Sequence, residues 1–199
     1  MIYKNIWFIL VPLILFAMLA ICIVSGVTLG SERWAYNEAV DHMSPTLNGI
    51  IKAITYIGDS AVVSVICLLF FIIGKTQKTI AWPISVAVIF SFILNIVLKH
   101  LFAQERPDIL RLINETSYSF PSGHAMINAS LYTIIKNKPR KVMLSVFCAL
   151  IIIIGYSRVY LGVHYAGDVL GGWIIGLAVS VFVYYQWNNK FYYQKEPFK

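Results

Sequence analysis

The chain has 199 residues, of which 59% are hydrophobic and only 13% are charged, and its mean hydropathy is +0.74. Soluble domains carry charge on about a quarter of their residues, so this composition excludes an ordinary soluble fold and indicates an all-α, polytopic membrane protein. The formal charge of +7 does not indicate a nucleic-acid partner, because the basic residues form no stripe. We expect a single domain over residues 1–199.

The first predicted transmembrane helix covers residues 6–30, an uncharged run long enough to cross a hydrocarbon layer of about 30 Å. A signal peptide is the competing interpretation because Lys4 precedes the run, but its apolar core would span only about 7–15 residues. Residues 31–57 alternate acidic, aromatic and apolar side chains. This pattern predicts a short interfacial helix between the first and second spans.

Five more spans follow, which gives six transmembrane helices in total. They are predicted at residues 61–74, 79–102, 121–136, 142–155 and 167–187. Asp59 precedes the second span and is a candidate N-cap, although an acid inside a membrane segment can also be functional. Pro83 falls near the first turn of the third span, where proline is tolerated.

The distribution of charge predicts the orientation in the membrane. If the six spans alternate, ten of the 16 Lys and Arg residues fall on the side of the N-terminus, together with one of the nine acids. Because cytoplasmic segments are enriched in Lys and Arg, both termini are predicted to be cytoplasmic in a multi-pass protein of the cell membrane. In this orientation, three polar clusters at the ends of predicted spans all lie on the outer side of the membrane.

Lys99 and Arg106 form the first polar cluster, two helical turns apart if the helix continues that far. Basic side chains at a helix end can simply snorkel to the interface. However, these two cations and Arg158 are expected on the outer face, and three cations that repel one another need an anion. A phosphate group fits, because the planar fork of Arg suits two-point contact with it.

The second cluster, Pro121-Ser122-Gly123-His124, is typical of a helix start with a capping serine. Backbone N–H groups at such a start form a natural seat for an anion. By itself Pro-Ser-Gly indicates only a turn, but a histidine directly after it, opposite the cations, favours a functional site.

In the third cluster His164 and Asp168 are four residues apart, so they share a face if both lie on a helix. A carboxylate that accepts from Nδ1–H leaves Nε2 free to attack or to accept a proton. A lone histidine would more often be structural. Here Arg158 precedes the pair, and Gly162 and Gly167 are expected to let a substrate approach closely.

Taken together, the three clusters resemble the signature of the type 2 phosphatidic acid phosphatase superfamily. Its members include bacterial phosphatidylglycerophosphate and undecaprenyl-pyrophosphate phosphatases and vanadium haloperoxidases. The matching positions are Lys99-x6-Arg106-Pro107, Pro121-Ser122-Gly123-His124 and Ser157-Arg158-x5-His164-x3-Asp168. The resemblance covers about a third of the chain, and the six-span layout is similar to that of the lipid-phosphatase branch.

The resemblance implies a mechanism without a metal ion or other cofactor. His164, oriented by Asp168, attacks phosphorus to form a phosphohistidine, and His124 protonates the leaving lipid alkoxide. The residues implied in holding the phosphate are Lys99, Arg106, Ser122, Gly123 and Arg158. No carboxylate-rich cluster in the sequence indicates a metal site, and the three cysteines lie in apolar runs without metal-ligand spacing.

The resemblance favours phosphatidylglycerophosphate as the substrate, hydrolysed at the extracytoplasmic face with the lipid tails still in the bilayer. Undecaprenyl pyrophosphate is the main alternative, and phosphatidic acid and diacylglycerol pyrophosphate stay open. A haloperoxidase and a non-enzymatic lipid transporter are the other classes, although a transporter has no evident need for the histidines. The loop at residues 103–120, with Arg111 and Glu115, is expected to help select the headgroup. The sequence does not determine the oligomeric state.

Overall fold

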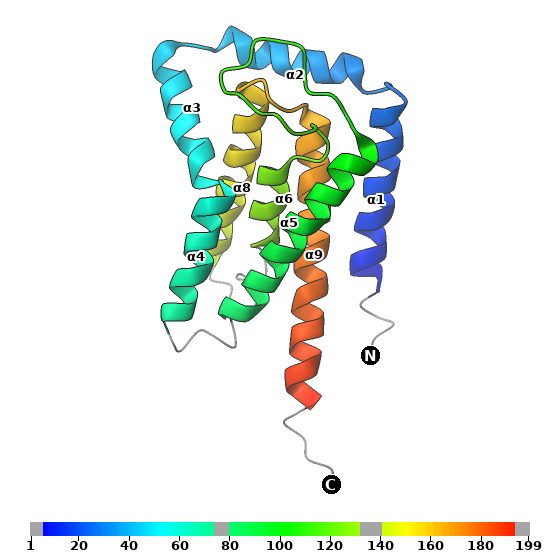
Figure 1. The fold of residues 1–199 in the computed structure, drawn as a ribbon, viewed down its shortest axis with the longest axis vertical. Coiled ribbons are helices and arrows are strands. Elements are labelled where there is room, and N and C mark those ends of the chain that lie inside the picture. Colours follow the sequence, from blue (N-terminus) through cyan, green and yellow to red (C-terminus); the bar gives the residue numbers. More distant parts are fainter. Residues whose placement is uncertain (1–5, 74–79, 132–140, 194–199) are drawn as a thin grey trace.

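The computed structural model describes residues 6–73, 80–131 and 141–193, and helices with their connecting loops make up these residues, without a strand, as predicted for an all-α protein. The helices are α1 (Trp7–Val24), α2 (Leu29–Asp41), α3 (Pro45–Ile57), α4 (Ser60–Ile72), α5 (Trp82–Phe102), α6 (Gly123–Ser130), α8 (Lys141–Tyr160) and α9 (Ala166–Tyr193). All but α2 run roughly along the long axis of the molecule (Figure 1).

The two ends of this bundle differ in what they carry. The chain enters α1 and leaves α9 at the same end, which agrees with an even number of crossings (Figure 1). At the opposite end, α2 lies across the bundle beside the long loop that joins α5 to α6 and the junction of α8 with α9. All three predicted clusters therefore belong to segments at this second end.

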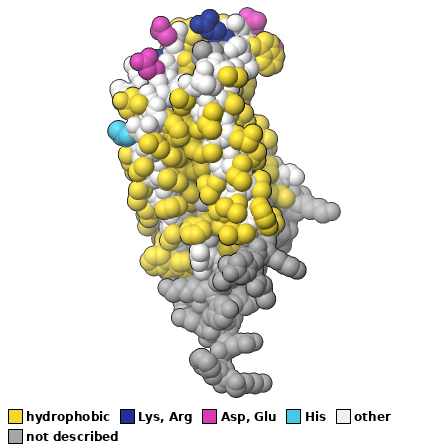
Figure 2. All heavy atoms as spheres, turned by 90° about the vertical axis from the view of Figure 1, so that its right-hand side faces the viewer, with side chains coloured by type: hydrophobic (Ala, Val, Ile, Leu, Met, Phe, Trp, Pro, Cys, Tyr) yellow, Lys and Arg dark blue, Asp and Glu magenta, His cyan; other side chains and the backbone are white. Residues whose placement is uncertain are grey.

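A belt of hydrophobic side chains lies on the bundle below this end. Figure 2 shows one face on which these side chains cover the middle of the molecule, whereas acidic and basic side chains gather at the end that holds α2. Large apolar residues of α1, α4 and α5 are exposed, among them Ile21, Ile72 and Leu101. In water such a surface would be costly, so the belt indicates the part of the protein that contacts lipid.

The number of membrane-spanning helices differs from the prediction. In the described residues three helices are long and apolar enough to cross a bilayer: α1, α5 and the Ala166–Trp187 part of α9. α3 and α4 meet the same requirement only as a pair, bent by 45° at the break between them, and they give a fourth span if the pair crosses as one. The predicted count of six is not reached by these criteria, because the apolar part of α8, Leu144–Tyr160, is shorter, and the predicted span at 121–136 ends outside the described residues.

The prediction of one interfacial stretch over residues 31–57 is wrong for its second half. Ser44 and Pro45 start a new helix, with Ser44 Oγ accepting from the Leu47 amide at 3.3 Å. That helix, α3, leads into α4 through the bend, so only α2 lies across the end of the bundle. At the bend, Asp59 is the N-cap of α4 as predicted, and its Oδ1 accepts from the Ala61 amide at 2.8 Å.

Close packing of α6 against α9 holds the second polar cluster in place. A Cβ added to Gly172 would lie 2.6 Å from the Ser122 carbonyl oxygen, and one added to Gly176 would lie 2.2 Å from that of Met126. Only glycine allows two helices to approach this closely, which is a common way to join helices in membranes. The start of α6 is therefore seated directly on the first turns of α9.

Candidate active site

The three predicted clusters come together at the end of the bundle that holds α2. Their cations arrive from three different segments: Lys99 from the last turn of α5, Arg106 from the loop after it, and Arg158 from the last turn of α8. Each of the three side chains contacts the same short segment, residues 115–119, that leads towards α6. The three cations thus belong to one site, as the sequence predicted.

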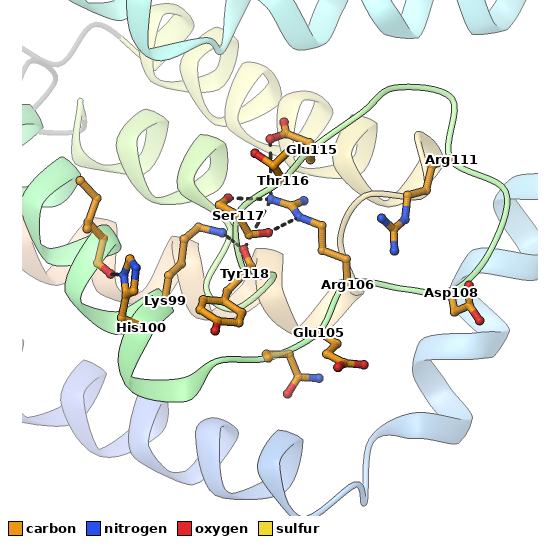
Figure 3. Close-up of a pocket in the computed structure, with 12 residues that line it drawn as sticks. Lys99, His100, Glu105, Arg106, Asp108, Arg111, Glu115, Thr116, Ser117 and Tyr118 are labelled. Carbon is orange, nitrogen blue, oxygen red and sulfur yellow. Dashed lines mark hydrogen bonds and ion pairs between the residues drawn. The ribbon is translucent and has the colours of Figure 1, made fainter.

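The side chains of Lys99 and Arg106 converge, as predicted. They do not do so from one face of a continuous helix, which was the expected geometry. The helix ends at Phe102 because Ala103 adopts a left-handed conformation with φ 45°, so Arg106 lies in the loop. The loop folds back and brings the two side chains onto adjacent carbonyls: Lys99 Nζ donates to Tyr118 and Ser119, the latter at 3.3 Å. Figure 3 shows both cations pointing towards this turn of the loop.

Arg106 makes more contacts than Lys99. Its Nε donates to the Ser117 carbonyl at 2.6 Å, and its Nη1 donates to the Val163 carbonyl at 2.7 Å and contacts His164 Nε2 at 3.3 Å. The guanidinium therefore joins the long loop to the turn between α8 and α9. Because only 9% of Arg106 is exposed, this link lies inside the protein.

Arg158 is almost fully buried, with 1% of its surface exposed. It is placed there because α8 continues to Tyr160, beyond its predicted end at residue 155. Nη1 donates to Thr55 Oγ1 of α3 at 2.9 Å, and Nη2 donates to Glu115. A buried charge needs such partners, and Glu115 also lies 3.7 Å from Arg106.

The carboxylate of Glu115 therefore lies between two guanidinium groups. Burial by itself would raise the pKa of this carboxyl, but Arg158 and Arg106 outweigh that effect and lower the pKa below 4.5. Glu115 is consequently an anion at neutral pH.

His164 and Asp168 form the predicted pair, although they do not share a helix face. α9 begins at Ala166, so His164 lies in the turn before it, and its Nδ1 is 3.2 Å from Asp168 Oδ2. The Tyr165 amide donates to the same oxygen at 2.9 Å, and Ser119 Oγ donates to it as well. Asp168 is completely buried, so three donors fix its position.

The contacts on both sides of the His164 ring select one tautomer. Arginine can only donate hydrogen bonds, so the nearby Arg106 requires Nε2 to accept, while Asp168 requires Nδ1 to carry the proton. Burial lowers the pKa of His164 well below 6.5, and the neighbouring Arg158 and Arg106 lower it further. The result is a neutral imidazole whose Nε2 lone pair faces the cations, which is the form required of a nucleophile.

Ser122, predicted to cap α6, does not do so through its side chain. It occupies the N-cap position, but its hydroxyl makes no capping bond, is fully buried and has no hydrogen-bond partner among residues 6–73, 80–131 and 141–193. Its backbone amide instead donates to the Asp168 carbonyl at 2.9 Å. Arg158 Nε is also buried and unpartnered within those ranges. These two donors are free to bind an oxygen-rich ligand.

His124 lies in the first turn of α6, with its Nε2 3.8 Å from Asp59 Oδ2 at the bend between α3 and α4. It is within electrostatic range of Arg158, Glu115 and Arg106, so it borders the site next to the bend between α3 and α4. Gly123 before it packs against Asn95 of α5, whose Oδ1 would be 3.0 Å from an added Cβ. Asn95 Nδ2 also donates to the Pro121 carbonyl at 3.0 Å.

The two glycines expected to admit a substrate serve the packing of the chain itself. A Cβ on Gly162 would lie 2.3 Å from the Leu110 carbonyl oxygen, and the residue has φ +71°. A Cβ on Gly167 would lie 2.6 Å from Glu32 Oε1, which accepts from the Gly167 amide at 3.1 Å. The space where a side chain would stand on each glycine is thus filled by the chain itself, which does not support the prediction that they let a substrate approach closely.

A polar cavity of about 750 Å³ adjoins the site on the side of α5 and the long loop. Lys99, Arg106, Arg111 and Glu115 line it together with Tyr118 (Figure 3). Arg111 donates from Nε and Nη2 to the Pro107 carbonyl, at 3.0 and 2.8 Å. The loop predicted to select the headgroup thus forms the wall of this cavity.

Sequence reasoning missed several residues that hold the site together. Ser119 contacts Asp168, Thr55 contacts Arg158, and Glu32 of α2 accepts from the start of α9. Burial raises the pKa of the Glu32 carboxyl, and the amides of Gly167 and Ala166 partly offset this effect. A carboxylate is favoured at a helix N-terminus, but nothing in the local sequence shows which helix an acid in α2 will reach.

Comparison of this chain with known proteins assigns it to one protein family. Residues 80–192 match the family model of the PAP2 superfamily, which confirms the resemblance found in the sequence motifs. The chain is 34% identical over 185 residues to phosphatidylglycerophosphatase B of Bacillus subtilis, covering 84% of this chain and 89% of that protein. It is also 33% identical to an undecaprenyl-diphosphatase of Sulfolobus acidocaldarius, over 68% of each chain.

Two solved structures share the fold. The transmembrane PAP2-type phosphatidylglycerolphosphate phosphatase from Bacillus subtilis superposes with a TM-score of 0.81 at 28% identity, covering 97% of this chain and all of that one. LpxE of Aquifex aeolicus superposes with a TM-score of 0.66 at 28% identity, over 78% of this chain and 93% of that one. Both similarities extend well beyond the motifs, so they include the arrangement of the helices.

Proposed function

Because the chain belongs to the PAP2 superfamily, we propose that it is a membrane lipid phosphatase that hydrolyses the phosphomonoester of phosphatidylglycerophosphate to phosphatidylglycerol and inorganic phosphate. One observation in particular supports this proposal. A neutral His164, held between Asp168 and Arg106, presents Nε2 among three cations that come from separate parts of the chain. Such an arrangement suits attack on a tetrahedral anion.

In the proposed reaction, Lys99, Arg106 and Arg158 bind the oxygens of the terminal phosphate, with the hydroxyl of Ser122 and the amide of Gly123. Their positive charge stabilises the negative charge on the equatorial oxygens in the transition state, which is the largest contribution that a phosphoryl-transfer site makes. The side chains themselves supply this charge, so we propose a reaction that needs no metal ion.

The first step forms a bond between His164 Nε2 and phosphorus while the bond from phosphorus to the lipid oxygen breaks. His124 gives its proton to the departing alkoxide, and Asp168 stabilises the positive charge on the His164 ring. In the second step water attacks phosphorus, His124 takes up a proton of that water, and the phosphorus–nitrogen bond breaks. Inorganic phosphate leaves, and both histidines return to their starting states.

We propose the orientation that the charge distribution predicts, with both termini cytoplasmic and the site at the extracytoplasmic face. The lipid tails stay beside the hydrophobic belt while the headgroup enters the polar cavity next to Lys99 and Arg106. The partners in this proposal are thus a membrane lipid as substrate and the surrounding bilayer.

The similarity to an undecaprenyl-diphosphatase keeps undecaprenyl pyrophosphate as the second candidate substrate. A lipid panel separates the candidates: the full chain in detergent is assayed for phosphate release from phosphatidylglycerophosphate, undecaprenyl pyrophosphate and phosphatidic acid, with and without a chelator. We expect the highest kcat/KM with phosphatidylglycerophosphate and no effect of the chelator. Higher kcat/KM with undecaprenyl pyrophosphate would reassign the substrate, and transport without any phosphate release would contradict the phosphatase.

A further inference from the structure

One acidic side chain of the long loop joins the two arginines of the site. Glu115 accepts from Arg158 Nη2 with Oε1, while its Oε2 lies 3.7 Å from Arg106 Nη2. The side chain is 29% exposed, whereas the two arginine side chains are 5% and 2% exposed. A partly accessible carboxylate therefore bridges two deeply buried guanidinium groups.

The other donor nitrogens of these arginines have partners on the chain, except Arg158 Nε, which has none in the described residues. Arg106 uses Nε and Nη1 for Ser117, Val163 and His164, and Arg158 uses Nη1 for Thr55. The Nη2 groups of both arginines meet at Glu115, and Arg106 Nη2 also donates to Ser117 Oγ at 3.1 Å and to the Tyr118 carbonyl at 3.4 Å. A carboxylate between two guanidinium forks has the charge and the oxygen geometry of part of a phosphate group.

We propose that Glu115 competes with the substrate for these two arginines and sets how much negative charge a lipid headgroup needs in order to enter. This inference deepens the proposed function and rests on it, because it takes Arg106 and Arg158 as ligands of the phosphate. A phosphate that bridges the two Nη2 groups has to displace the carboxylate first. The fraction of molecules in which the carboxylate has moved away reduces the apparent affinity of every anion by the same factor.

Because the factor is the same for every anion, Glu115 leaves the ratio of the affinities unchanged and acts as a threshold, which a weakly bound phosphodiester fails to pass at the concentrations where a phosphomonoester still binds. A monoester carries a charge of about −1.5 to −2 at pH 7, whereas a phosphodiester carries only one negative charge, as Glu115 does. The surrounding bilayer and the product phosphatidylglycerol present phosphodiesters. Glu115 thus keeps the arginines from being occupied by lipids that the enzyme does not hydrolyse.

A purely positioning role for Glu115 makes the opposite prediction. If the carboxylate served only to hold the arginines in place, its removal would loosen them and weaken the binding of every anion. The sign of the change in affinity therefore distinguishes a competitor from a positioning residue. Glu115→Gln is a suitable probe, because it removes the charge and keeps the shape of the side chain.

The experiment measures the Kd of inorganic phosphate by calorimetry with the full chain in detergent. If the arginines are free of the carboxylate about a tenth of the time, Glu115→Gln binds phosphate about tenfold more tightly than wild type. Glu115→Ala serves as a second charge-removing variant. Glu115→Asp keeps the charge, and Glu38→Gln makes the same charge change on an exposed part of α2; both are expected to stay within about twofold of wild type.

The threshold for a singly charged anion is measured with the same variants through inhibition of phosphate release by a soluble phosphodiester, diethyl phosphate. Glu115→Gln is expected to lower its inhibition constant by about tenfold, and Glu38→Gln leaves it unchanged. Equal or weaker phosphate binding by both charge-removing variants would overturn the inference. A wild-type chain that neither binds phosphate nor releases it from any lipid would instead overturn the proposed function.

Discussion

His164 Nδ1 lies 3.2 Å from Asp168 Oδ2 across the first turn of α9, while the opposite ring nitrogen faces Arg106 at 3.3 Å. The ring is therefore held from both sides, and neither contact requires the two residues to lie on one helix. The turn supplies a further restraint, since the Tyr165 amide donates to the same carboxylate oxygen. The position and the tautomer of the proposed nucleophile both follow from these contacts.

Replacement of His164 by alanine should abolish turnover. Without the imidazole there is no nucleophile, and we expect phosphate release to fall at least about a thousandfold, as it does for removal of a covalent catalytic residue in other enzymes. The assay is phosphate release from phosphatidylglycerophosphate, with His42→Ala on the exposed end of α2 as the matched control. An active His164→Ala variant would falsify the assignment of the nucleophile.

The contacts of Asp168 predict two effects of different size. Asp168→Asn offers an amide to Nδ1 and favours the wrong tautomer of His164, and the loss in kcat should approach about 10⁴-fold. Ser119→Ala removes one of three donors to the carboxylate, so kcat should fall only about tenfold, the equivalent of one hydrogen bond. KM should change little in both variants. A Ser119→Ala variant that loses activity through KM alone would show that Ser119 contacts substrate instead.

Lys99→Ala should weaken the binding of phosphate more than it slows the chemistry. Lys99 is 8% exposed and its ammonium group contacts only backbone carbonyls in the described part of the chain, so it retains its charge for a bound anion. Loss of one charge-assisted contact should raise the Kd of orthovanadate by about 10- to 100-fold. Lys52→Ala on α3 is the control. A normal Kd combined with a reduced kcat would contradict a binding role.

The buried, neutral state of His164 predicts a dependence of stability on pH. Its pKa in the folded protein lies well below the ordinary value of 6.5, so below pH 6.5 the unfolded chain binds a proton that the folded protein does not. The free energy of unfolding should therefore fall as the pH drops below 6.5, by up to about 1.4 kcal/mol per pH unit from this residue.

The measurement is denaturant unfolding in detergent between about pH 5 and pH 7.5, a window above the one in which Glu115 titrates. His164→Asn should show a shallower pH dependence than wild type, while His42→Ala should show the same dependence. Parallel curves for wild type and His164→Asn would mean that folding does not change the pKa of His164, which would contradict a buried, neutral ring.

The close contact of α6 with α9 makes Gly176 sensitive to any side chain. Gly176→Val places carbon atoms against the Met126 backbone and should lower the free energy of unfolding by about 1–3 kcal/mol. It should also reduce activity, because α6 carries Ser122 and His124. Gly49 is the contrasting position: an added Cβ meets nothing within 4 Å, so Gly49→Ala should stabilise α3 by about 0.5–1 kcal/mol. Equal stability of the two variants would contradict the packing of α6 on α9.

The sequence alone was sufficient for the class of fold and the family, and it named the side chains that the structure brings together at one end of the bundle. Long uncharged runs can only be buried in lipid or in a helical bundle, so the helices at α1, α5 and α9 followed from composition. The N-cap role of Asp59 was equally local, because a cap acts on amides two or three residues away. The family followed from the spacing of the basic residues, histidines and Asp168 in three motifs.

Only the tertiary structure decided how these residues meet. The left-handed Ala103 ends α5 early, so Lys99 and Arg106 converge through a folded loop and not through helical periodicity. The partners of the buried charges, Glu115 for Arg158 and Glu32 for the start of α9, come from 43 and 135 residues away in the chain. Helical periodicity and capping depend on residues only a few positions apart. The partner of a buried charge is instead the side chain that tertiary packing places beside it, and the local sequence does not identify that side chain.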